Sequence, residues 1–186
     1  MDTYKIRPDG IKYQELDLEI SDIIDDFPEE VSLDDAHDFS KLNLSLANWW
    51  KPVSTEFIKI EEGGDQIPDL SKWIDATLVL SPLAHEVLED LLAPHGEFVR
   101  VFVDGEKFCI FNCLEMVDVD KENSECDELG LPKKLAFNRK DIQGKHIFKT
   151  SFDHCGFLYC SGELKKRIDQ SRLKGIVFDS DIANAF

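Results

Sequence analysis

Apolar and polar residues follow clear periods between residues 77 and 120, and the period changes at residues that begin or end elements. Residues 77–80 form a short apolar run typical of a buried strand. Ser81 followed by Pro82 is an N-cap with proline at the first helical position. Apolar residues then recur at helical spacing: Leu83, Ala84, Val87, Leu88, Leu91 and Leu92. The pattern predicts a strand and then a helix that ends before Pro94.

The next residues predict a hairpin. Two strand-like runs, residues 98–103 and 106–119, flank Asp104-Gly105, whose residue types suit the positive φ angles of a two-residue turn. This turn pairs Val103 with Glu106 and Val99 with Ile110. One face of the hairpin is then apolar except at Glu106 and Asn112, and we expect it in the core: Val99, Val101, Val103, Phe108, Ile110, Leu114 and Met116. The opposite face is expected to be half covered.

Both ends of the chain carry weaker signals. Residues 157–160 read as a strand, Ser161 as the N-cap of a helix over 163–173, and residues 176–178 as a final strand. At the other end, residues 4–7 and 11–13 read as a hairpin around Pro8-Asp9-Gly10. Residues 42–46 fit either a strand or a short helix, and residues 120–130 form a charged loop.

Together these elements predict an α+β fold with a largely antiparallel or mixed sheet and a few packed helices. A length of 186 residues suits a single domain, 1–186, in which an acidic region, 1–75, precedes a core over 76–186. No apolar run approaches the ~20 residues of a membrane helix, and residues 1–10 do not resemble a signal peptide. We therefore expect a cytoplasmic protein.

Charge is distributed unevenly along the chain, whose formal net charge is −17. Residues 1–75 hold 19 acidic and 7 basic residues and residues 76–129 hold 13 and 3, whereas residues 130–186 hold 6 and 11. Nucleic acids and anionic membranes bind positive patches, so neither is an expected partner. A protein with a basic surface is the expected partner, and the simpler alternative is that the acidity only keeps the protein soluble.

We name Asp17 to Asp38 the acidic segment. Apolar residues such as Ile23 and Phe27 are spaced among its carboxylates and are expected to fix it to the body of the protein, so that the charges are held in place. Its candidate partner-binding residues are Asp25, Asp26, Glu29, Glu30, Asp34, Asp35 and Asp38. Fields from exposed charges decay over about 8 Å at physiological salt, so we expect them to act mainly on the association rate.

Trp49 and Trp50 are further candidates for partner binding. On a strand one of the two rings faces the core and the other faces water, and an exposed tryptophan is a frequent anchor of protein interfaces. The alternative is that the N-terminal region covers both rings.

Chemical motifs are absent from the sequence. It contains no glycine-rich phosphate loop, no His-Glu-x-x-His and no Gly-x-Ser-x-Gly. Cys109 and Cys113 are about 13 Å apart if they lie on one strand, too far to bind one ion. His154 and Cys155 are adjacent, so their side chains point apart in an extended chain. We expect no catalytic residue, no cofactor and no metal, and the five cysteines without a Cys-x-x-Cys pair predict a reducing compartment.

Three segments taken together carry a family resemblance. Residues 67–70 lead into 78–81; Pro94-His95-Gly96-Glu97-Phe98 precedes a hairpin whose return strand reads Phe111-Asn112-Cys113; and 148–149 lead through 158–161 to 173–178. In order and spacing they resemble immunity protein family eleven of bacterial polymorphic toxin systems, over about residues 66–179.

This resemblance implies a small cytosolic protein, encoded beside a toxin, that binds and neutralises the toxin and has no catalytic residues. Two alternatives from other classes stay open. One is an enzyme that reverses a toxin's modification through His154, Cys155 or a carboxylate pair. The other is a chaperone or adaptor that delivers an effector for secretion.

Overall fold

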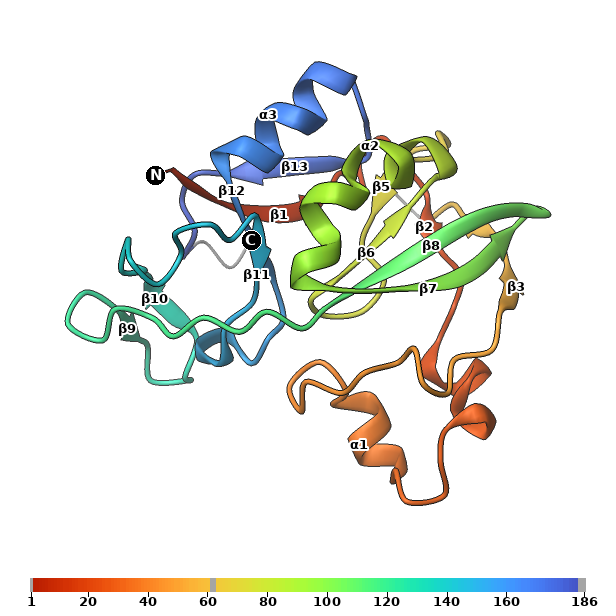
Figure 1. Cartoon of the computed structure of the whole chain (residues 1–186), viewed down its shortest axis with the longest axis horizontal. Coiled ribbons are helices and arrows are strands. Elements are labelled where there is room, and N and C mark those ends of the chain that lie inside the picture. Colours follow the sequence, from red (N-terminus) through yellow and green to blue (C-terminus); the bar gives the residue numbers. More distant parts are fainter. Residues whose placement is uncertain (1, 61–62, 184–186) are drawn as a thin grey trace.

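The computed structural model describes residues 2–60 and 63–183, which form an α+β fold built on two main sheets (Figure 1). The larger sheet is mixed, because its edge strand β3 runs parallel to β7 while the other neighbours are antiparallel. Across this five-stranded sheet the order is β3 (Val53–Thr55), β7 (Gly96–Val103), β8 (Glu106–Cys113), β6 (Thr77–Leu80) and β5 (Leu70–Ser71). The predicted fold class is confirmed.

The second main sheet has four antiparallel strands and joins the two ends of the chain. Its order is β11 (Ile147–Phe148), β12 (Leu158–Ser161), β1 (Thr3–Pro8) and β13 (Ile176–Asp179). The predicted hairpin over residues 4–13 is wrong, since β1 pairs with β12 and β13 instead. Pairing on both edges lets Ile6 reach 4% exposure, which a surface hairpin cannot provide.

Two smaller pairs complete the strands, β2 (Glu15–Leu16) with β4 (Phe57–Ile58) and β9 (Glu125–Cys126) with β10 (Pro132–Lys134). The region predicted as a charged loop, 120–130, therefore contains one strand of a hairpin. Residues 42–46 form a turn followed by irregular chain, neither the strand nor the helix that the sequence allowed.

The central hairpin has the predicted register, with Val103 opposite Glu106 and Val99 opposite Ile110. Both turn residues have positive φ, 51° at Asp104 and 83° at Gly105. The return strand is shorter than predicted, because the N–H groups of residues 114 and 115 both donate to the carbonyl of His95 and the chain turns away. Leu114 and Met116 therefore lie outside the core face on which the sequence placed them.

The two long helices begin at the predicted serine caps. Ser81 accepts the N–H of Ala84 at the start of α2 (Pro82–Leu92), and Ser161 accepts that of Leu164 at the start of α3 (Gly162–Ser171). The helices pack against each other, and Arg167 on α3 pairs with Asp90 on α2. In the described residues no helix is long and apolar enough to cross a membrane.

Strand alternation divides the apolar residues into three clusters. Leu78 and Leu80 point into the cluster formed by α2, α3 and parts of both sheets, while Val79 points to the opposite face of the five-stranded sheet. That opposite face is covered by the acidic segment and the residues up to Leu46, which lie below β7 in Figure 1. The outer face of the four-stranded sheet is covered by residues 117–142, which we name the second covering segment.

Candidate partner-binding site

The acidic segment is held against the five-stranded sheet by apolar side chains that recur between its acids. Two 3-10 turns, η1 (Ile20–Asp22) and η2 (Ile24–Asp26), and the short helix α1 (Leu33–His37) bring these residues to one side. They are buried in the second cluster: Leu18, Ile20, Ile23, Phe27 and Ala36. The segment has no long regular element, yet its carboxylates are placed on the outer side by the packing of their neighbours.

The seven predicted acidic residues fall into two groups. Three are partly buried and engaged: Asp26 pairs with Lys51, Asp38 with Lys41 at 2.5 Å, and Asp35 accepts the hydroxyl of Ser32 at 2.8 Å. The other four are exposed and form no ion pair with any residue in 2–60 or 63–183: Asp25, Glu29, Glu30 and Asp34. These four present unneutralised negative charge to solvent.

Trp49 and Trp50 are both half-buried at the edge of the second cluster. The ring of Trp49 lies against Phe27, with centroids 3.7 Å apart. Trp50 donates its indole N–H to the carbonyl of Arg100 at 2.8 Å and meets Trp73 edge to face. Trp49 is thus packed against the acidic segment through Phe27, whereas Trp50 is fastened to β7, and both rings keep part of their surface exposed.

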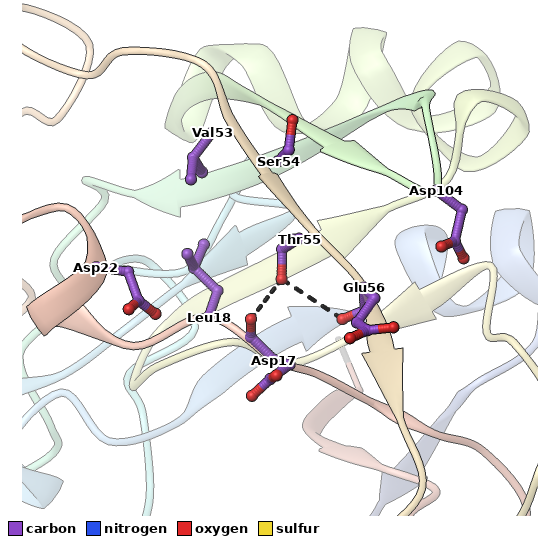
Figure 2. Close-up of a pocket in the computed structure, with 8 residues that line it drawn as sticks. All are labelled: Asp17, Leu18, Asp22, Val53, Ser54, Thr55, Glu56 and Asp104. Carbon is purple, nitrogen blue, oxygen red and sulfur yellow. Dashed lines mark hydrogen bonds between the residues drawn. The ribbon is translucent and has the colours of Figure 1, made fainter.

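A groove lies beside the acidic segment at the edge of the five-stranded sheet. It has a volume of about 580 Å³ and is lined by Asp17, Leu18, Asp22, Val53, Ser54, Thr55, Glu56 and Asp104. Figure 2 shows Asp22 and Asp104 at opposite ends of the groove, with Asp17 and Glu56 between them. Sequence reasoning missed this site because its acids come from three separate parts of the chain. Asp17 and Asp22 lie in the acidic segment, but no local signal places them beside Asp104.

His154 and Cys155, which the enzyme alternative would use, are not arranged as a reactive pair, and Glu61-Glu62, a candidate carboxylate pair, lies outside the described residues. Cys155 is 1% exposed, and burial raises the pKa of its thiol, which disfavours the nucleophilic thiolate. His154 is exposed and adopts the left-handed conformation, as does Cys155. Burial likewise raises the pKa of Cys113 to about 12. Within the described part of the chain, no three His, Cys, Asp or Glu side chains are grouped so that they would hold a metal ion.

Comparison with models of known protein families identifies the family of this chain. The family model described as Immunity protein family (Imm11) matches residues 46–182. The chain belongs to the Imm11 family. No individual curated protein matches it. The resemblance seen in three sequence segments is thus confirmed, over a somewhat longer range than those segments indicated.

The matched Imm11 region begins at Leu46, shortly after the acidic segment ends at Asp38. The matched residues contain the whole five-stranded sheet, α2, α3 and the second covering segment. The acidic segment precedes them, but it supplies the layer that buries one face of the Imm11 sheet. In this Imm11 protein the acidic segment thus lies N-terminal to the matched region and buries its apolar residues against the matched sheet.

Proposed function

We propose that this Imm11 protein protects a bacterial cell by binding a cognate toxin in a stoichiometric complex, and that the exposed carboxylates of the acidic segment attract a basic surface of that toxin. Membership of an immunity protein family supports the neutralising role. The observation that carries the finer proposal is the set of four exposed acids, without an ion pair among the described residues, on a segment anchored by buried side chains. Charges on an anchored segment keep a fixed geometry, so they steer association.

The proposed role implies where the protein acts and how it acts. The protein acts in the cytoplasm, where a toxin delivered by a neighbouring cell, for example by type VI secretion, would reach its target. It acts as a binder without a catalytic step, a cofactor or a metal. The gene of the toxin is expected next to the gene of this protein, and the toxin domain encoded there is the probe for the experiments below.

A matched pair of triple variants tests the role of the acidic segment. Asp25, Glu29 and Glu30 are replaced by lysine in one protein, and Glu122, Glu125 and Glu128, which are equally exposed, in the other. The first variant should associate with the toxin domain at least about 10-fold more slowly at low salt, with a flattened salt dependence. The second should stay within about 2-fold of wild type. Stopped-flow or surface-immobilised kinetics at several salt concentrations give both numbers.

Three outcomes contradict parts of the proposal. Equal slowing by both variants would mean that only the total charge matters. No slowing by either would place the interface elsewhere, and Trp49 and Trp50 would be tested next. Failure of the wild-type protein to bind the toxin domain or to protect cells that express it would reject the immunity role itself.

The enzyme alternative has its own test. Single serine substitutions at the five cysteines, and His154→Ala, should leave protection intact in every variant that folds. A folded Cys155→Ser or His154→Ala protein that binds the toxin domain normally but fails to protect cells would support catalysis instead. Toxin-challenge survival and a binding assay on the same variants separate the two readings.

A further inference from the structure

Strand β3 is an edge of the five-stranded sheet, and its outer side is only partly covered. The chain at β2 lies along the β4 end of this edge, where the N–H of Asp17 donates to the carbonyl of Glu56 at 2.9 Å and the hydroxyl of Thr55 donates to the carbonyl of Asp17 (Figure 2). Beyond Asp17 the chain turns away into η1. The groove of about 580 Å³ begins at this point.

The backbone of Ser54 faces this groove. The carbonyl of Thr55 accepts the N–H of Asp104 at 3.4 Å, on the side of β7, whereas the carbonyl of Glu56 points to the opposite side, toward Asp17. Successive residues of a strand direct their N–H and C=O groups to alternate sides. Ser54 therefore directs both groups outward, and among the described residues no strand pairs with that side of β3. An open N–H and C=O on an edge strand are a template for another strand.

The lining of the groove defines what kind of strand fits. Four of its lining residues are acidic, Asp17, Asp22, Glu56 and Asp104, and none is basic. Alternate side chains of an extended peptide lie about 6.4–6.8 Å apart on one face, so lysines or arginines at alternate positions can meet carboxylates along the groove. An acidic or neutral strand would be repelled or left unpaired at the same place.

We infer that the groove beside β3 binds an extended segment of the toxin bearing lysine or arginine at alternate positions, which adds to the five-stranded sheet as a sixth strand through the backbone of Ser54. This inference rests on the proposed function, because it specifies how the toxin is held once attracted. Steering by the acidic segment acts on the association rate, and backbone pairing at β3 acts on the dissociation rate.

Two substitutions at one position provide the test. Ser54→Pro removes the outward N–H, and proline is tolerated on an edge strand when its nitrogen faces away from the sheet. Ser54→Ala keeps the N–H and removes only the hydroxyl. With the toxin domain from the adjacent gene, Ser54→Pro should raise the dissociation rate about 5- to 10-fold, as expected for the loss of one main-chain hydrogen bond and its neighbour. Ser54→Ala should stay within 2-fold of wild type.

Hydrogen exchange on the wild-type protein gives a second readout that does not depend on the folding of a variant. The Ser54 amide should exchange rapidly in the free protein and at least about 10-fold more slowly in the complex. Unchanged exchange at Ser54 in a complex that forms normally would overturn the inference, as would equal effects of Ser54→Pro and Ser54→Ala. Both results leave the immunity role standing, whereas absence of wild-type binding removes the immunity role and the inference together.

Discussion

The acidic segment and the second covering segment have the same structural role but differ in net charge. Each lays mostly irregular chain over the outer face of one main sheet and buries isoleucine, leucine or valine there. The acidic segment holds ten acidic residues and no lysine or arginine, while residues 117–142 hold seven acidic and five basic residues. Covering a sheet therefore does not require an excess of carboxylates. Under the proposed function, the excess in the acidic segment serves to attract the toxin.

The largest expected effect tests whether the two segments are equal as parts of the core. Ile20 in the acidic segment and Ile142 in the second covering segment are 2% and 4% exposed. Each isoleucine-to-alanine substitution should lower the free energy of unfolding by about 2–4 kcal/mol, from lost burial and a residual cavity. Urea unfolding measures both. A cost below about 1 kcal/mol at Ile20 alone would show that the acidic segment detaches from a fold that is stable without it.

The next effect concerns the residue that fastens the end of the N-terminal layer. The carboxylate of Glu97 on β7 accepts the N–H of Leu46 at 2.5 Å, the hydroxyl of Ser45 at 2.6 Å and the side-chain amide of Asn112 at 2.8 Å. In Glu97→Gln the amide oxygen can keep the bonds from Leu46 and Asn112, but the NH₂ replaces the oxygen that accepts from Ser45, and all three bonds lose their charged acceptor. We expect a loss of about 2 kcal/mol in unfolding free energy. Glu97→Asp is the control, because it keeps the negative charge on a shorter side chain. An unchanged midpoint of urea unfolding in Glu97→Gln would refute this role.

Beside the second covering segment, Glu115 makes a comparable set of contacts, and their contribution to stability depends on pH. Glu115 pairs with Lys145 and with Nδ1 of His95 at 3.2 Å, while Nε2 of His95 accepts the N–H of His146. Burial works to raise the pKa of Glu115, but the hydrogen bonds from Lys145 and His95 outweigh it and the pKa is lowered. The folded state thus favours the ionised form, and the resulting stability is present above the unfolded pKa of about 4.3 and is lost as pH falls through the lower folded value.

Comparison of wild type with Glu115→Gln checks this dependence. The difference in unfolding free energy should be largest, about 1–2 kcal/mol, near pH 6 and should shrink toward pH 3. Urea unfolding at intervals between these values gives the curve. A difference that stays constant with pH would mean that Glu115 acts through packing and not through its charge.

The smallest expected effect on stability is the one that best distinguishes the two sides of the acidic segment. Lysine at Asp25, Glu29 and Glu30 should change the free energy of unfolding by less than about 0.5 kcal/mol, because all three side chains are exposed and unpaired. The same substitutions are expected to slow toxin association. Thermal or urea unfolding of the triple variant therefore separates the outer side of the acidic segment, which we propose binds the toxin, from its inner side, which packs in the core.

Local signals predicted the fold where neighbouring residues determined it. Ser81 with Pro82, Ser161, and the Asp104-Gly105 turn set the starts of both helices and the register of the hairpin, and all three were correct. The errors arose where distant residues compete. The outward turn after β1 looked like a hairpin, but β12 and β13 bury Ile6 on both edges, a gain that no short window of sequence displays.

The candidate site, like the fold, was predictable from the sequence only in part. The acidic segment was identified from composition, and its anchoring by Ile23 and Phe27 follows from their spacing. The groove was not predictable, because Asp17, Ser54 and Asp104 meet only through the parallel pairing of β3 with β7. Parallel neighbours leave no turn signature between them, so the sequence carries no local mark of this edge.

The position of β1 sets the order in which the protein can be completed during synthesis. Strand β1, Thr3–Pro8, occupies an inner position between two strands that end at Ser161 and Asp179. Its hydrogen-bonding partners leave the ribosome only after more than 150 further residues have been translated, so the four-stranded sheet cannot form cotranslationally from its own beginning. The five-stranded sheet, whose strands all lie between Val53 and Cys113, is free to assemble earlier and to serve as the platform on which the two ends of the chain finally meet.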